Sequence, residues 1–126
     1  MNGILGRFDL DAITSDSLPK ITGGRQSATL IKTEQLRVVL VHLEAKQTLQ
    51  EHSAPGPITI HCLRGQMRVG VGADESLLFP GHLISIDSNV RHDAEAISDS
   101  SFLLTIAWPP AGQRKHDIPV LDEHGD

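Results

Sequence analysis

The side chains best suited to chemistry in this chain are its histidines, seven among 126 residues. Two of them flank turns. His52 precedes an Ala-Pro-Gly-Pro turn, and His92 follows the Ser88-Asn89 turn. If the two hairpins that carry them face each other across a barrel, both imidazoles point into the same mouth. Neutral imidazole is a common ligand of transition metals, so His52 and His92 are candidate metal ligands that would by themselves form a weak site.

His61 is a candidate third ligand whose direction depends on the strand that carries it. Neighbouring residues of a strand point to opposite faces, so His61 points outward if Ile58, Ile60 and Cys62 point inward. A bulge or kink at the preceding Pro-Gly-Pro bend would reverse this alternation and turn His61 inward. The other four histidines are interpreted as solvated, turn or buried structural residues: His42, His82, His116 and His124.

The elements that must position these residues are short and rich in β-formers. Runs with strand character alternate with turn residues, and no helical period of ten or more residues is present. The pattern predicts an all-β domain, either a sandwich or a closed barrel. We expect the barrel at residues 25–108, an N-terminal arm at 1–24 and a C-terminal tail at 109–126. The predicted strands are Ser27–Lys32, Leu36–Glu44, Ile58–Leu63, Gln66–Val71, Glu75–Phe79, Leu83–Asp87, Arg91–Ile97 and Phe102–Trp108.

Apolar residues at alternate strand positions are candidates for the lining of a binding site. If Ile58, Ile60, Leu104 and Ile106 face inward, they form a surface suited to an apolar or mixed organic molecule. The small-molecule ligand itself cannot be named from the sequence.

Two strands are apolar on both faces, which indicates that both faces are covered. Val38 to Val41 form one such run, and Phe102–Trp108 carries Leu103 on the face opposite to Leu104. The second cover is either the N-terminal arm or another subunit. We favour the subunit and therefore predict a homodimer.

Charge and composition exclude other classes of protein. The formal net charge is -5 and Lys and Arg form no cluster, so we expect no nucleic-acid partner. No apolar run approaches the ~18–20 residues that a membrane span needs. The N-terminus does not resemble a signal peptide, and the single Cys62 fits a reducing compartment, so we expect a cytoplasmic protein.

The stretch from Arg37 to Trp108 resembles a small single-domain cupin. Cupins share a first motif, Gly, five residues, His-x-His, three or four residues, Glu, six residues, Gly, which is similar to 46–65 here. Their second motif, Gly, five residues, Pro-x-Gly, two residues, His, three residues, Asn, is similar to 81–96. His52 and His92 match motif histidines. The resemblance implies a single-domain double-stranded β-helix, or jelly-roll barrel, and is closest to uncharacterised bacterial cupins with Ala-Pro-Gly-Pro after the first histidine.

The departures from the two motifs concern the metal site above all. The family binds metal through three histidines and a glutamate, whereas Ala54 and Ile58 stand at two of these four positions. The resemblance therefore implies a divalent ion (Zn, Fe, Ni or Mn) that is weakly bound or absent. Lys46 and Asn89 stand where motif glycines are expected, and Lys46 is predicted to cost stability if its φ is positive.

Three functions remain open at this point. The first is a cupin that binds a small organic molecule in the barrel mouth beside a degenerate metal site. The second is a metal-dependent oxygenase or isomerase that uses His52, His61 and His92. The third is a regulatory or assembly module that acts through its dimer surface. Whether the chain is an enzyme is left undecided.

Overall fold

The computed structural model describes residues 3–13, 15–18 and 25–108, with nothing described for the side chains of Ser15, Glu51 and His52. Two short 3-10 turns, η1 (Leu10–Ala12) and η2 (Ser15–Ser17), precede the strands. The strands are β1 (Gln26–Lys32), β2 (Leu36–Leu43), β3 (Thr48–His52), β4 (Ile58–Arg64), β5 (Met67–Val71), β6 (Asp74–Leu78), β7 (Leu83–Ile86), β8 (His92–Ala96) and β9 (Ser100–Ala107).

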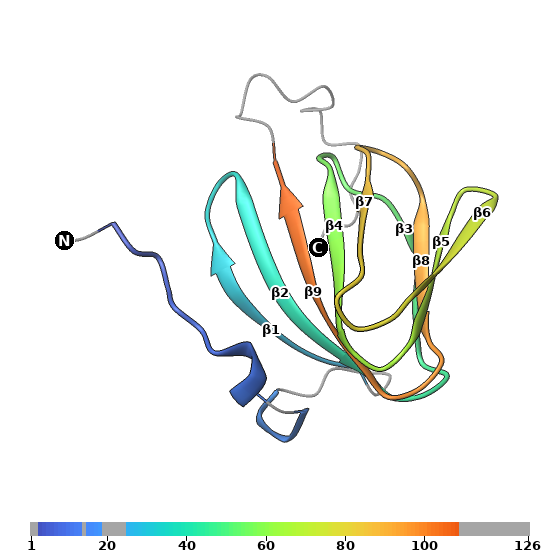
Figure 1. Cartoon of the computed structure of the whole chain (residues 1–126). Helices are drawn as coiled ribbons and strands as arrows, with labels where there is room; N and C mark the ends of the chain where they lie inside the picture. The colour runs from blue at the N-terminus through green and yellow to red at the C-terminus, as the bar shows by residue number, and fades with distance from the viewer. Residues whose placement is uncertain (1–2, 14, 19–24, 109–126) are drawn as a thin grey trace.

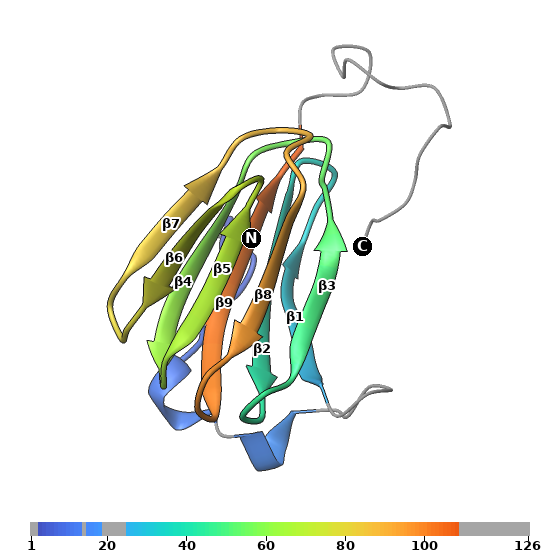
Figure 2. The ribbon, with the colours of Figure 1, turned by 90° about the vertical axis from the view of Figure 1, so that its right-hand side faces the viewer.

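The strands form two antiparallel sheets that face each other (Figure 1). The five-stranded sheet has the order β1-β2-β9-β4-β7, and the four-stranded sheet has the order β3-β8-β5-β6. Figure 2 shows the four-stranded sheet in front of the five-stranded one. The all-β architecture predicted from the short strand runs is confirmed.

The core lies between the sheets because each central strand alternates buried and more exposed residues. In β4, Ile58, Ile60 and Cys62 belong to the core, and the residues between them do not. Phe102 of β9 and Met67 of β5 are fully buried in the same core, one from each sheet. Burying a side chain of this size stabilises the folded state by about 1.5–3 kcal/mol.

The strand β3 is absent from the strands predicted above. Its residues are mostly polar, and Leu49 is the one hydrophobic side chain it contributes to the core. Since β3 lies at the edge of the four-stranded sheet, polar residues along it are typical of an edge strand. One hydrophobic residue in five is too few to produce the alternation that identifies a strand from sequence.

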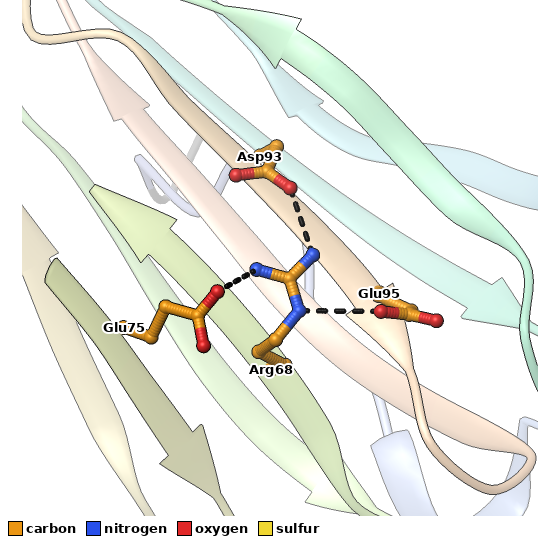
Figure 3. Close-up of polar contacts among 4 residues, drawn as sticks. All are labelled: Arg68, Glu75, Asp93 and Glu95. Carbon is orange, nitrogen blue, oxygen red and sulfur yellow. Dashed lines mark hydrogen bonds and ion pairs between the residues drawn. The ribbon is translucent and has the colours of Figure 1, made fainter. Parts of the chain in front are cut away.

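The outer face of the four-stranded sheet is charged (Figure 3). Arg68 of β5 binds three carboxylates, with N···O distances of 2.9 Å to Asp93, 3.2 Å to Glu95 and 3.3 Å to Glu75. The hydrogen bond with Asp93 is the main cause that raises the pKa of the Arg68 guanidinium. This face is therefore suited to contact with water.

The outer face of the five-stranded sheet is more apolar. The register of β1, β2, β9, β4 and β7 brings five residues into one row across it: Ala28, Leu40, Leu103, His61 and Leu83. Leu40 is only 2% exposed although it points away from the core, whereas Leu83 is 61% exposed. Leu103 lies in the middle of this outer row and is half-buried.

Two turns contain a residue with positive φ, a backbone conformation that is unfavourable for residues other than glycine. Lys46 has φ 75° and Asn89 has φ 62°, at the two positions where the cupin motifs have glycine. Gly65 and Gly81, which match motif glycines, also have positive φ. The condition under which Lys46 was predicted to cost stability, a positive φ, is therefore met.

The predicted tail at 109–126 lies outside the described residues, together with His116 and His124. In the part of the chain that the structure describes, no helix is both long and apolar enough to cross a membrane.

Candidate functional site

Two loops bring the predicted site residues to one end of the barrel, the upper end in Figure 1. Residues 53–57 connect β3 to β4, and residues 87–91 connect β7 to β8. The Asn89 N–H donates to the Ala54 carbonyl oxygen at 2.7 Å, which ties the loops together. The Ala107 N–H donates to the Pro57 carbonyl oxygen at 3.0 Å, which joins the end of β9 to the same loop.

The Ala-Pro-Gly-Pro turn packs tightly against β9. A Cβ atom added to Gly56 would collide with the Ala107 carbonyl oxygen and approach the Trp108 Cα to 3.3 Å. Glycine is therefore required at position 56, because the backbone of this turn lies too close to the backbone of Ala107 and Trp108 to leave room for a side chain. This contact positions the start of β4 beside the end of β9.

The backbones of His52 and His92 lie directly opposite each other across β3 and β8. A register shift between Leu49 and His52 produces this pairing, because it adds one residue to β3. Such a bulge changes which residue of a strand faces a given partner. The two residues thus come from neighbouring strands of one sheet and not from hairpins that face each other across the barrel, and their role as metal ligands stays a prediction.

His92 occupies a buried inward position at the upper end. The residue is 4% exposed, and its Nδ1 lies 3.1 Å from the Val90 carbonyl oxygen. A protonated Nδ1 would donate to this carbonyl, which is the contact that orients many metal-binding histidines. A structural histidine makes the same contact, so this geometry suits both roles.

His61 lies on the outward face of β4. It alternates with Ile58, Ile60 and Cys62, which belong to the core, and it pairs with Leu103 and Leu83 of the outer row. The bend at Pro55-Gly56-Pro57 does not reverse the alternation of β4. The structure therefore separates His61 from His92 by the thickness of the five-stranded sheet.

The four predicted lining residues point into the core, and they form two layers. Ile58 pairs with Ile106 nearer the upper end, and Ile60 pairs with Leu104 one layer deeper. Ile58, Ile60 and Ile106 are 3%, 2% and 7% exposed, and Leu104 packs against the same core. Their inward direction follows the strand alternation, whereas their contact with a ligand stays a prediction.

Arg37 and Trp108 also lie at the upper end, and the sequence reasoning did not select them. Arg37 is in register with Ile106, and its guanidinium lies 5.1 Å from the centroid of the Trp108 ring. A usable signal was present in the sequence. Arg37 has the same strand parity as Val39 and Val41, so a cation stands on the face of β2 that packs in or against the core.

No family model and no curated protein matches this chain. Several solved structures match it. A conserved protein of unknown function from Streptococcus pyogenes matches with a TM-score of 0.71 at 21% identity, over 84% of this chain and 90% of that chain. A cupin superfamily protein from Desulfitobacterium hafniense matches with a TM-score of 0.69 at 12% identity, over 75% of this chain and 87% of that one.

This chain has the cupin fold. The expected cupin-type barrel is therefore confirmed. Salicylate 1,2-dioxygenase from Pseudoaminobacter salicylatoxidans has the same fold, with a TM-score of 0.64 at 14% identity, over 70% of this chain and 27% of that enzyme. At these identities the likeness establishes the fold and not the activity.

The residues at the cupin metal positions do not fit the family's ligand set. Ala54 and Ile58 have hydrocarbon side chains, and both pack with the core. The described side chains contain no group of three or more His, Cys, Asp or Glu that could hold a metal ion. The family's metal chemistry therefore cannot be transferred to this barrel intact.

Proposed function

We propose that this cupin binds a small organic molecule at the upper end of its barrel. The observation that carries the proposal is that the inward-facing residues change from apolar to polar along the barrel axis. Deeper in the barrel they are apolar, as at Ile60 and Val69, whereas Arg37 and His92 introduce polar groups at the upper end. Apolar surface with a few polar groups is typical of small-molecule sites.

The fold comparison is compatible with this function. One protein of the same fold is named a salicylate dioxygenase, an enzyme of a small organic substrate. We infer that this chain uses the end of its barrel for a small organic molecule without the full set of metal ligands in the cupin motifs. Metal held by His52 and His92 alone would be weak, because a tight site needs about three or four protein ligands.

Trp108 provides a local test of the proposal. It is the only tryptophan in the chain, and the chain contains no tyrosine. Its emission therefore reports on the upper end alone. A set of metabolites should be screened by melting temperature, and each stabilising compound should then be titrated while Trp108 emission is recorded.

Compounds that bind at the upper end should raise the melting temperature and also change the emission of Trp108. Compounds that stabilise the protein but leave the emission unchanged would indicate a site elsewhere. An absence of any stabilising compound in a broad screen would contradict a ligand-binding function.

We also propose that the chain forms a homodimer through the outer face of its five-stranded sheet. The outer row supports this, since Leu103 is half-buried and Leu83 is 61% exposed within one chain. The charged outer face around Arg68 makes the other sheet a poor candidate. A dimer surface as the main function of the protein is the second candidate function.

A further inference from the structure

Two side chains of the barrel hold the segment that precedes β1. The Arg64 guanidinium donates to the carbonyl oxygens of Asp11 at 2.9 Å and of Ile13 at 3.4 Å. The Gln26 side-chain amide donates at 3.2 Å to the carbonyl oxygen of Leu18, which is buried. Gln26 and Arg64 belong to one row across the five-stranded sheet, at the lower end of the barrel in Figure 1. The segment is therefore fixed to that end of its own chain.

The residues before this attachment, 3–9, form a leading segment that runs away from the barrel (Figure 1). It lies on the outer side of the five-stranded sheet, so that in Figure 2 it lies behind that sheet. Every residue in it is exposed, including Leu5 at 70% and Phe8 at 42%. Because large apolar side chains gathered at a surface mark interaction sites, we expect the leading segment to contact another molecule.

The outer face of the five-stranded sheet is uncharged above the row of Arg64. Its outward positions follow from strand alternation with the core residues. These positions are Val38 and Leu40 in β2, Leu103 and Thr105 in β9, Thr59 and His61 in β4, and Leu83 and Ser85 in β7. None of them is Lys, Arg, Asp or Glu, in contrast to the face around Arg68. This face is therefore suited to an apolar contact.

We propose that the leading segment of each chain packs on the outer face of the five-stranded sheet of a second copy. There Leu5 and Phe8 cover the outer row that contains Leu83. This inference rests on the proposed homodimer and names the segment that covers its interface. The chain's own leading segment is the weaker candidate, since in the single chain it leaves Leu83 61% exposed. In a twofold dimer the exchange is reciprocal, so one substitution in the segment changes two contacts.

The first experiment measures the dissociation constant of the dimer by sedimentation of the full chain at several concentrations. The double variant Leu5→Ser/Phe8→Ser should raise the dissociation constant at least about tenfold, because two apolar side chains lose their burial in each half of the dimer. Ile97→Ser is the matched control, since Ile97 is 48% exposed and follows β8 of the other sheet. It should leave the dissociation constant unchanged.

The second experiment locates the leading segment by cross-linking. Phe8→Cys and Leu83→Cys are made as separate proteins, one with a mass tag, and are incubated together with a short bismaleimide. The native Cys62 is fully buried, so the reagent reacts at the introduced cysteines. A cross-linked pair that contains one chain of each kind should form. Leu77→Cys in place of Leu83→Cys is the control and should give no such pair, because Leu77 is 56% exposed on the other sheet.

The outcomes separate this inference from the homodimer on which it rests. A monomeric wild type would overturn both. A wild-type dimer whose dissociation constant is unchanged in Leu5→Ser/Phe8→Ser would leave the homodimer standing and overturn the exchange of leading segments. If a protein that carries both Phe8→Cys and Leu83→Cys is cross-linked only within one chain, the segment covers its own sheet and the inference is wrong. Since Leu5 and Phe8 are exposed in the single chain, their replacement should leave each barrel folded.

Discussion

The Cα atom of His52 lies opposite that of His92 because β3 contains one residue more than β8 between this pair and the pair Leu49–Ala94. A regular ladder continued from Leu49 and Ala94 would instead place Glu51 opposite His92. The bulge therefore decides which residue of β3, Glu51 or His52, has its backbone opposite His92. Bulges are frequent next to functional sites, where they re-aim a side chain.

Metal binding at the upper end should be weak and should depend on both His52 and His92. Since Ala54 and Ile58 cannot coordinate, water or an organic ligand must complete the coordination shell, and neither retains metal on dilution. Protein purified without a histidine tag should contain metal well below one equivalent, measured by elemental analysis. His52→Ala and His92→Ala should each remove what binds, whereas the outward-facing His61→Ala should not. Stoichiometric metal that survives dialysis against a chelator would contradict this prediction.

A charge on the outer face of the five-stranded sheet should dissociate the predicted dimer. Leu103→Glu puts a carboxylate in the middle of the outer row, where a stable interface of at least ~1,000 Å² in total would have to bury it. Sedimentation should show a lower mass for Leu103→Glu than for the wild type. Leu77→Glu is the matched control, because Leu77 is 56% exposed on the outer face of the other sheet. A monomeric wild type at micromolar concentration would rule out the dimer.

Replacing Lys46 by glycine should stabilise the fold by about 1 kcal/mol, because a side chain at positive φ is strained and glycine is not. The φ of 75° at Lys46 makes this a direct test. Asn89→Gly should have a smaller effect, since asparagine tolerates the same conformation at φ 62°. Lys32→Gly, in β1, should destabilise. Denaturant unfolding measures all three, and a destabilised Lys46→Gly would show that the side chain makes compensating contacts.

The Arg68 cluster should contribute a small, salt-dependent stabilisation. Arg68→Gln leaves Glu75, Asp93 and Glu95 facing one another without the cation that binds them. Because all three carboxylates are at least 36% exposed, we expect a loss of only about 1 kcal/mol at low ionic strength. The loss should shrink as salt screens the repulsion. Unfolding at several salt concentrations measures it, with Arg64→Gln as control; a salt-independent loss would indicate a packing effect.

Local patterns in the sequence were sufficient to predict most of the strands and the two turns that contain Lys46 and Asn89. The core strands β4 and β9 carry enough hydrophobic and β-branched residues between turn residues to be recognised as strands. Lys46 and Asn89 fall at motif glycine positions, and their φ values agree with that alignment. The outward direction of His61 also follows from the alternation of β4, once Ile58 and Ile60 are known to be in the core.

Only the tertiary structure decided the features that depend on pairing between segments far apart in the sequence. The strand β3 has too few buried residues to be recognised in sequence, and its bulge exists only in the register with β8, about 40 residues away. The contact of Arg37 with Trp108 joins the first residues of β2 to the end of β9. By itself, the sequence determined most of the strands and the turns, because these depend on near neighbours. Which side chains meet at the upper end was decided by strand register, which is set by the packing of the whole barrel.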